Sequence, residues 1–388
     1  MITANTEAIR PVRIRVLGIG GAGSNALDQM LKSNIENIGY IAINTDKQAL
    51  ARSNAAKKMH IGERITHGLG AGGNPDVGRQ AAMDSLTEIE EAVTECDILF
   101  LVAGFGGGTG TGAAPVVAQA AREKNILTVC IATTPFDFEG QKRKSQALEG
   151  VRRVDDHADT VITVANDKLF QIADMSLSLA EAFAFTNDIL SEGVQCIARL
   201  INKTGLINLD FADVRAIMAN GGRAALGFSA SSGQGSAVEA AQRALENPLF
   251  DLEALPRARG LLISIMGGDD LGMREVKEAA EKISELGNRN AHVIFGAVVD
   301  AEFRGQRLVT VLATSLDGER EKAEESQAAV SGAQAHVSVP QQTLIDLDFN
   351  SYEHFEDTEP TIVEGENLDV PTFLRKRVQV TAGIRDKG

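Results

Sequence analysis

The alternation of apolar and polar residues predicts a sheet in the first half of the chain. Short apolar runs alternate with longer stretches in which apolar residues recur every three or four positions. The runs predicted as strands are Arg13–Leu17, Tyr40–Asn44, Ile98–Ala103, Leu127–Thr133 and Thr160–Ala165. The stretches predicted as helices are Asn25–Lys32, Val77–Cys96, Ala113–Lys124 and Gln141–Ala158. This order predicts an α/β fold, a Rossmann-like parallel sheet with helices on both faces.

The middle of the chain predicts a long helix and then a smaller α+β domain. Apolar residues recur at spacings of three and four throughout Leu177–Asn202. The elements predicted after it are helices at Phe211–Ala219 and Arg274–Leu286 and strands at Gly260–Met266, His292–Val299 and Leu308–Ala313. We therefore expect a first domain over residues 12–176, a connecting helix over 177–203 and a second domain over 204–316.

The periodicity is lost after residue 316, and the charge becomes strongly uneven. Between Asp317 and Val370 there are fourteen Asp and Glu residues against two Lys and Arg residues. This composition predicts a disordered acidic linker over residues 317–368. Residues 369–388 then carry a basic tail, in which Phe373 and Leu374 stand beside basic residues. Apolar anchors next to a basic cluster favour a short docking peptide over a solvated tail.

Composition excludes several classes of function. A formal net charge of −15 argues against general nucleic-acid binding. The segment Met1–Pro11 lacks the apolar region of a secretion signal, and no apolar run approaches the roughly 18 residues that span a bilayer. We therefore expect a cytoplasmic protein that does not insert into membranes. The three cysteines lie in apolar surroundings, which predicts buried, reduced thiols. The histidines have no metal-ligand spacing, so no structural transition-metal site is expected.

Two glycine-rich loops each follow a predicted strand and precede a predicted helix. Gly104–Gly112 has six glycines in nine residues, and Gly18–Asn25 contains the pattern G-x-G-x-x-G with Asp46 about twenty residues further on. Backbone N–H groups in such loops, together with the positive end of the following helix, hold phosphate groups. The pattern in Gly18–Asn25 alone fits a Rossmann oxidoreductase equally well. Two such loops at neighbouring strand ends instead favour a phosphate chain held from two sides.

Three further clusters could complete a nucleotide site. Asn44–Asp46 follows the second predicted strand. Glu139 could accept hydrogen bonds from ribose hydroxyls, and Arg143 could bind a phosphate or a base carbonyl, although the two could equally form a surface ion pair at i,i+4. Phe183 and Asn187 share one face of the long helix, where they could stack on and read a purine, or form a core aromatic with a capping amide.

Asp210 and Asp213 are three residues apart at the start of a predicted helix. One interpretation is a capping box with Asp210 as the N-cap. The other is a carboxylate pair that polarises water and helps to hold a divalent cation. A helix start can present both functions. Because the pair follows the long helix, we expect it to serve the nucleotide of a neighbouring molecule.

Together these segments resemble the tubulin/FtsZ family in its bacterial form. The residues that carry the resemblance are Asn44–Asp46, Gly106–Gly112, Pro135–Arg143, Asn208–Asp213 and Asp369–Arg377. The likeness runs from about residue 13 to 316 and resumes at 369–377. It implies a GTP-binding, GTP-hydrolysing protein that forms head-to-tail filaments in the division ring at mid-cell.

The resemblance also implies a role for each matching residue. Gly21–Asn25 and Gly108–Gly110 would bind phosphates of GTP or GDP, with Mg²⁺ expected alongside. The full set of implied nucleotide-binding residues is Gly20, Gly21, Ala22, Gly23, Ser24, Asn25, Asn44, Gly104, Gly107, Gly108, Thr109, Gly110, Thr133, Pro135, Glu139, Arg143, Asn166, Phe183 and Asn187. Asn208, Asp210 and Asp213 would be catalytic toward the next subunit. The implied partners are copies of the chain and, through Asp369–Arg377, membrane-tethering division proteins.

The chain departs from the family pattern in its second half. Gly221–Arg223 and Gly227–Ser236 replace a usually Met-rich stretch, Lys203-Thr204 replaces a more typical pair, and Ile283–Asn290 is less acidic than usual. These positions concern filament contacts rather than nucleotide binding. The alternative is therefore a divergent paralogue, or a nucleotide-binding scaffold with altered polymer properties.

Overall fold

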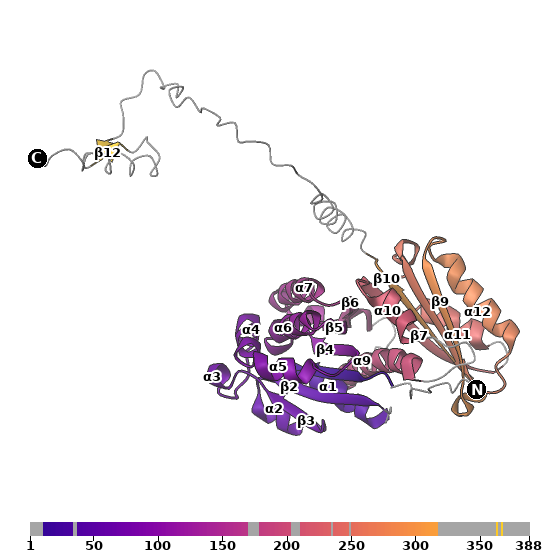
Figure 1. The fold of residues 1–388 in the computed structure, drawn as a ribbon, viewed down its shortest axis with the longest axis horizontal. Coiled ribbons are helices and arrows are strands. Elements are labelled where there is room, and N and C mark those ends of the chain that lie inside the picture. The colour runs from indigo at the N-terminus through magenta and orange to yellow at the C-terminus, as the bar shows by residue number, and fades with distance from the viewer. Residues whose placement is uncertain are drawn as a thin grey trace, which may run out of the picture. The chain divides into compact units, whose positions relative to one another are not determined.

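The structure is a computed structural model in which two compact units are distinguished, Met1–Gln327 and Ala328–Gly388 (Figure 1). It describes residues 11–33, 37–169, 178–202, 210–233, 236–247, 250–316, 362–363 and 366–367. Most of the described residues belong to the first unit, which holds all the elements discussed below except one short hairpin.

The first unit is built on one sheet of ten strands. In chain order these are β1 (Ile14–Ile19), β2 (Ile38–Asn44), β3 (Lys57–His60), β4 (Ile98–Gly104), β5 (Leu127–Thr134), β6 (Thr160–Ala165), β7 (Gly222–Ser232), β8 (Gly260–Gly267), β9 (His292–Val299) and β10 (Gln306–Thr314). Their order across the sheet is β3-β2-β1-β4-β5-β6-β7-β10-β8-β9. Strands β1 to β6 pair in parallel, and β7 continues this with a parallel pairing to β6. β10 runs antiparallel to both β7 and β8.

The helices cover both faces of this sheet. They are α1 (Gly20–Met30), α2 (Lys47–Arg52), α3 (Glu63–Thr66), α4 (Pro75–Asp84), α5 (Leu86–Val93), α6 (Thr109–Glu123), α7 (Gln141–Asp155), α8 (Asn166–Leu169), α9 (Leu179–Asn202), α10 (Phe211–Met218), α11 (Ser236–Leu245) and α12 (Met273–Leu286). Short 3-10 turns lie at Leu31–Ser33, Asp137–Glu139, Leu255–Arg257 and Ala301–Phe303. The predicted α/β class, with a parallel sheet, a long helix and a smaller second region, is confirmed.

The long helix α9 joins the two parts of the sheet. Leu190, Val194 and Ile197 on α9 are buried in one hydrophobic cluster with residues of β1, β4 and β5 and with Leu312 of β10. Figure 1 shows α9 lying between the early strands and the later ones. The sheet and this shared core are continuous from β6 to β10, so the domain boundaries at 176 and 203 remain predictions.

Several elements escaped the sequence prediction. β3 carries two lysines and a histidine in four residues, so it has no apolar run. β7 is rich in Gly, Ala and Ser, which are not typical strand formers. At Gly227 an added Cβ would lie 2.3 Å from the Ala244 carbonyl oxygen of α11, so the close approach of that helix requires glycine. The predicted helix Val77–Cys96 is divided at Ser85 into α4 and α5.

The linker and the docking peptide fall almost wholly outside the described residues. Within the predicted linker the structure describes Ile362–Val363 (β11) and Glu366–Asn367 (β12), which pair as a short antiparallel hairpin. The predicted docking peptide Asp369–Arg377 lies outside the described part of the chain.

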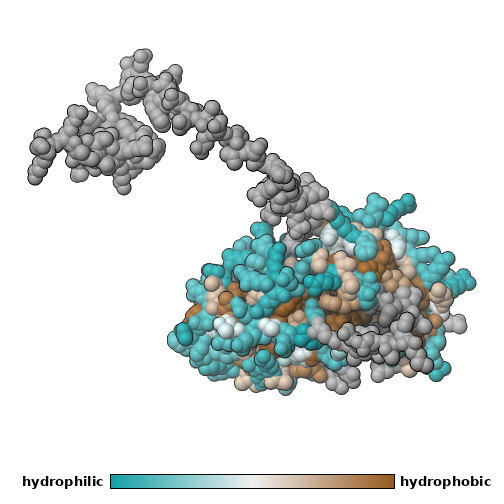
Figure 2. All heavy atoms as spheres, in the orientation of Figure 1, coloured by the Kyte–Doolittle hydropathy of each residue, from teal (hydrophilic) through white to brown (hydrophobic). Residues whose placement is uncertain are grey.

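The described surface is mostly hydrophilic on the face that Figure 2 presents, with separate apolar patches. Among the helices that the structure describes, none has both the length and the apolar character to cross a membrane.

The three cysteines are buried and free, as the sequence predicted. Burial raises the pKa of the Cys96 thiol to about 11 and the pKa values of Cys130 and Cys196 to about 12. Because the thiolate is the reactive form, we expect a disulfide reagent to react with none of them rapidly at pH 8. Full reaction should follow denaturation. Fast labelling of the native protein would contradict this expectation.

Candidate functional site

The two predicted glycine loops lie side by side at the carboxyl ends of adjacent strands. β1 and β4 are direct neighbours, and each loop follows one of them. A Cβ added at Gly20, whose φ is +74°, would lie 3.1 Å from the Gly110 amide nitrogen. One added at Gly110 would lie 2.4 Å from the Gly104 carbonyl oxygen. The N-termini of α1 and α6, with their unpaired N–H groups, therefore start close together.

The glycines of these loops serve two different purposes. A Cβ at Gly23 would lie 2.2 Å from the Val102 carbonyl oxygen, so this glycine lets α1 pack closely against β4. A Cβ at Gly21 or Gly107 would meet no described atom within 4 Å. These two residues face open space beside the helix N-termini, which is the arrangement that an anion-binding loop requires.

A third glycine-rich loop, Gly68–Asn74, packs against the second one and was missed by the sequence analysis. Gly68, Gly70, Gly72 and Gly73 all have positive φ angles. A Cβ at Gly108 would lie 2.7 Å from Ala71 Cβ and 3.0 Å from the Asn74 nitrogen. Four glycines in seven residues before a helix start were a usable signal. The loop follows the short helix α3 and not an apolar strand. The sequence analysis looked for glycine loops between a strand and a helix, so it did not detect this one.

The Asn44–Asp46 cluster touches the second glycine loop through Thr45. The Thr45 side chain is fully buried, and its hydroxyl oxygen lies 2.7 Å from that of Thr109 at the start of α6. The Asn44 side-chain oxygen accepts a hydrogen bond from the Asp46 amide. The Asp46 carboxylate accepts from the amides of Gln48 and Ala49, so it caps α2. Asp46 therefore serves as a helix cap, whereas the dinucleotide pattern predicts an acidic residue that binds a ribose hydroxyl.

The loop after β5 is held in place by charged side chains. Glu139 accepts a hydrogen bond from the Phe136 amide and also pairs with Arg143. The i,i+4 ion pair is thus present, with Arg143 more than half exposed and Glu139 largely buried. Asp137 pairs with Lys144, which lowers the pKa of the Asp137 carboxyl. Thr133 and Pro135, which precede these residues, border the second glycine loop: Thr133 Oγ1 is near Gly104 and the Pro135 ring near Gly106.

Aromatic side chains gather where this loop meets α9. Phe136 is buried, stacks on Phe138 with ring centroids 5.0 Å apart, and meets the edge of Phe183 at 5.5 Å. Phe183 is 41% exposed, so it is not a core residue. Asn187, one turn further along α9, is partly buried. An exposed ring beside an amide can stack on and read a flat heterocycle.

Two predicted site residues have buried polar side-chain atoms that make no hydrogen bond to the described residues. Ser24 and Asn166 are 4% and 5% exposed. Among the described residues, Ser24 Oγ and Asn166 Oδ1 find no hydrogen-bond partner. Because an unpaired buried polar atom is costly, these atoms fit a site that a polar ligand completes.

Asp210 and Asp213 form the predicted capping box. Asp210 Oδ1 accepts from the Asp213 amide at 2.7 Å, and Asp213 Oδ2 accepts from the Asp210 amide at 3.1 Å. Asp210 is exposed and Asp213 partly exposed. Asn208, the third residue that the resemblance implied to be catalytic, lies outside the described residues.

Helix α10, which starts at these aspartates, lies at the amino ends of the strands, whereas the glycine loops lie at the carboxyl ends. Arg215 of α10 donates to the Asn125 carbonyl, just before β5 begins. The Met218 carbonyl at the end of α10 accepts from Thr160 Oγ1 at the start of β6. Both contacts are at the amino ends of strands, whereas the glycine loops follow carboxyl ends. At a rise of about 3.3 Å per residue, the two ends of strands β1, β5 and β6 lie about 17 to 23 Å apart.

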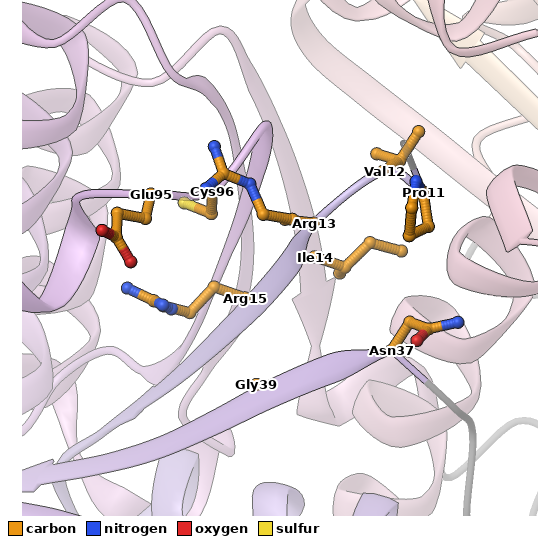
Figure 3. A pocket seen from close by; sticks show the side chains of 9 residues that line it. All are labelled: Pro11, Val12, Arg13, Ile14, Arg15, Asn37, Gly39, Glu95 and Cys96. Atoms are coloured by element: carbon orange, nitrogen blue, oxygen red, sulfur yellow. The ribbon is translucent and has the colours of Figure 1, made fainter. Parts of the chain in front are cut away.

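A separate cavity of about 310 Å³ lies at the amino ends of β1 and β2. Figure 3 shows Arg13 and Arg15 directed to the same side as Glu95 and Cys96. These cations already have partners, since Arg15 donates to the carbonyls of Ala92 and Thr94, and Arg13 pairs with Asp97. The cavity is therefore a feature of the strand ends and not part of the nucleotide-type site.

Comparison with known proteins agrees with this geometry. Residues 13–174 match the model of the Tubulin/FtsZ family, GTPase domain, and residues 222–317 match the FtsZ family, C-terminal domain. The chain is 45% identical over 336 residues to cell division protein FtsZ 2 of Rhizobium meliloti (strain 1021), which covers 87% of this chain and 96% of that protein.

Solved structures give the same result. An empty FtsZ dimer from M. jannaschii is 41% identical, with a TM-score of 0.75 over 79% of this chain and 89% of that one. CetZ2 from Haloferax volcanii, solved as a GTPγS-bound protofilament, is 22% identical, with a TM-score of 0.69 over 84% of this chain and 100% of that one. This second likeness concerns the fold alone.

Proposed function

Because the chain belongs to the tubulin/FtsZ family, we propose that it hydrolyses GTP only where two copies meet head to tail. As a family member it is a GTP-dependent, polymerising cell-division protein with GTPase activity. The observation that carries the proposal is the position of Asp210 and Asp213 at the sheet edge opposite the glycine loops. Carboxylates at that edge cannot reach a nucleotide bound to the same molecule.

In this proposal the glycine loops bind the phosphates of GTP. The N-termini of α1 and α6 supply backbone N–H groups and the positive ends of two helix dipoles. Gly21 and Gly107 leave room for the phosphate oxygens, since no described atom lies within 4 Å of their Cβ positions. These fixed donors stabilise the negative charge that develops on the phosphates during hydrolysis. Gly20, Ala22, Gly23, Ser24, Asn25, Asn44, Gly104, Gly108, Thr109 and Gly110 complete the proposed phosphate cradle.

The other end of the nucleotide would lie against α9 and the loop after β5. Phe183 offers a ring face to the guanine, and Asn187 offers an amide to its edge. Glu139 and Arg143, with Thr133 and Pro135 before them, would face the ribose and its surroundings. The unpaired Asn166 Oδ1 would gain a hydrogen-bond donor from the ligand.

Asp213 and Asp210 of the next subunit would orient and polarise the attacking water. Their capping box fixes both carboxylates at a helix start, ready to accept a proton from water. Asn208 would shape the same loop. We also propose Mg²⁺ bound with GTP, where it neutralises phosphate charge. The described residues contain no group of three His, Cys, Asp or Glu side chains suited to a metal. The proposed Mg²⁺ would take most of its ligands from phosphate oxygens and water.

The domains then have separate tasks. Residues 12–176 would bind the nucleotide, α9 within 177–203 would connect, and 204–316 would activate the neighbour. Copies of the chain would associate head to tail, and an FtsZ from M. jannaschii has been solved as a dimer. The peptide Asp369–Arg377, beyond the acidic linker 317–368, would dock on membrane-tethering division proteins. The assembly would act in the cytoplasm at the division site.

The proposal predicts that GTP turnover per molecule depends on protein concentration. Turnover and light scattering should be measured together across a dilution series with magnesium present. Turnover should stay near zero at low concentration and rise above a threshold where scattering also rises. Constant turnover per molecule in the most dilute samples would mean that one chain holds the complete site. Scattering without turnover would instead favour the alternative of a nucleotide-binding scaffold.

A further inference from the structure

His60, at the end of the edge strand β3, lies between two hydrogen-bond acceptors. Its Nδ1 is 2.8 Å from Glu63 Oε2, and its Nε2 is 3.2 Å from the Thr45 carbonyl oxygen. The side chain is only 14% exposed. A neutral imidazole has one N–H donor, whereas the imidazolium has two. Both contacts are therefore satisfied together only when His60 is protonated.

The neutral ring must lose one of the two contacts. The Glu63 carboxylate is a stronger acceptor than a carbonyl because it is charged. Lys47 pairs with Glu63 and lowers the pKa of the Glu63 carboxyl. The single proton of a neutral His60 would then stay on Nδ1, so that the Nε2 lone pair faces the Thr45 carbonyl oxygen. Loss of the charge thus turns the contact with Thr45 from attractive to repulsive.

Thr45 connects His60 to two of the glycine loops. Its carbonyl also accepts from the Gly70 amide at 3.2 Å, in the loop Gly68–Asn74. Its hydroxyl lies 2.7 Å from the Thr109 hydroxyl, at the start of α6. The Thr66 hydroxyl is 3.2 Å from the same carbonyl, but it has one proton and is 3.1 Å from the Gly62 carbonyl as well. The carbonyl therefore has the Gly70 amide as one donor, and His60 supplies the second donor that Thr66 alone cannot guarantee.

The charged groups around His60 come from each neighbouring element. Glu63 belongs to α3, Lys47 to α2, and His67 ends α3 near enough to act on the Glu63 charge. Lys58, two residues earlier on β3, donates to the Ala51 carbonyl.

We propose that His60 is a positioning residue whose protonation holds Thr45, and through it Thr109 and the loop at Gly70, in the arrangement that GTP turnover needs. The inference rests on the proposed function. It makes turnover by this chain fall when the His60 ring becomes neutral. The group acts through Thr45 and does not itself touch the nucleotide.

Two substitutions at position 60 separate the two contacts. In His60→Gln the amide nitrogen takes the place of Nε2 and donates to Thr45 at every pH. In His60→Asn it takes the place of Nδ1 and reaches Glu63 only. Between pH 6 and 8, the ratio of His60→Gln to wild-type turnover should rise by about 3- to 10-fold, the value of one hydrogen bond. His60→Asn should be low at both pH values.

Glu63→Gln provides a second, independent test. Its amide can donate to Nδ1, so that a neutral His60 keeps its proton on Nε2 and still donates to Thr45. Turnover in this variant should lose the dependence on His60 protonation. The control Lys47→Gln removes the ion pair between Lys47 and Glu63 but leaves the carboxylate opposite Nδ1, so turnover should still fall when His60 becomes neutral. Melting temperatures of all four variants establish that each is folded.

The outcomes separate this inference from the function on which it rests. If the wild type turns over GTP and His60→Gln follows the same pH profile, the role of His60 is overturned while the proposed function stands. If His60→Asn matches His60→Gln at both pH values, the contact with Thr45 is not the one that matters, and the inference also fails. Absence of turnover in the wild type at every concentration and pH would instead overturn the proposed function.

Discussion

Asp213→Asn is expected to lower GTP turnover by about 100-fold or more, the usual contribution of a positioned general base. The substitution keeps a side-chain oxygen that can accept from the Asp210 amide, so the capping box that starts α10 remains. Only the charge and the basicity are lost. GTP affinity should change by less than about 2-fold because the carboxylate does not contact the nucleotide of its own chain. Steady-state phosphate release measures the expected loss of turnover, and equilibrium GTP binding measures the expected constancy of the affinity.

A mixing experiment shows on which molecule Asp213 acts. Gly21→Val places a side chain in the open space beside the N-terminus of α1 and is expected to abolish GTP binding while leaving Asp213 intact. Each variant alone should be inactive. A mixture should regain turnover, because the intact Asp213 of one chain meets the GTP held by the other. If the mixture stays inactive although the two variants co-assemble, the role of Asp213 between subunits must be abandoned.

Gly23→Ala is expected to destabilise the fold by about 3 kcal/mol, within the range for forced overpacking. The added Cβ would lie 2.2 Å from the Val102 carbonyl oxygen and 3.0 Å from the Gly18 carbonyl carbon, both backbone atoms that cannot rotate away. α1 must therefore move off the sheet, and its N-terminus moves with it. Thermal unfolding without nucleotide should show a melting temperature lower by several degrees, and GTP binding should be lost.

The matched control is Gly21→Ala, two residues earlier in the same loop. Here the added Cβ meets no described atom within 4 Å, and alanine favours the helix by about 0.4–1 kcal/mol over glycine. The melting temperature without nucleotide should stay unchanged or rise slightly. GTP affinity should nevertheless fall by about 10-fold, since the methyl group enters the space proposed for the phosphates. Normal GTP affinity in this variant would show that the phosphates do not bind on this side of the loop.

The parallel strands β1, β2, β4, β5 and β6 were predictable because their patterns are local. Each contains a short run of mostly apolar residues, and most of these residues are buried. The two glycine loops that follow β1 and β4 were predictable for the same reason, since strand, loop and helix are consecutive in the chain. The Asp210 capping box was also predictable from the sequence, because a capping box involves residues only three apart.

β3 and β7 were not predictable, because distant partners decide them. β3 is an edge strand with two exposed lysines, and it exists because β2 offers it a ladder. β7 has weak strand residues, but its residues from Ala225 to Ser232 pair with β10, about eighty residues later. Burial of α11 against it outweighs the low strand propensity of its Gly, Ala and Ser residues.

The groups proposed for nucleotide chemistry could be recognised in the sequence alone: two glycine loops, an aromatic and an amide on one helix face, and two carboxylates at a helix start. Each is a short-range pattern that neighbouring residues set. Only the tertiary structure decided how these parts are distributed. It brought Gly20 and Gly110 together, added the loop Gly68–Asn74 beside them, and set Asp210 and Asp213 at the other edge of the sheet. The physical reason is that strand order and helix packing arise from burial between residues far apart in the chain, which no local spacing records.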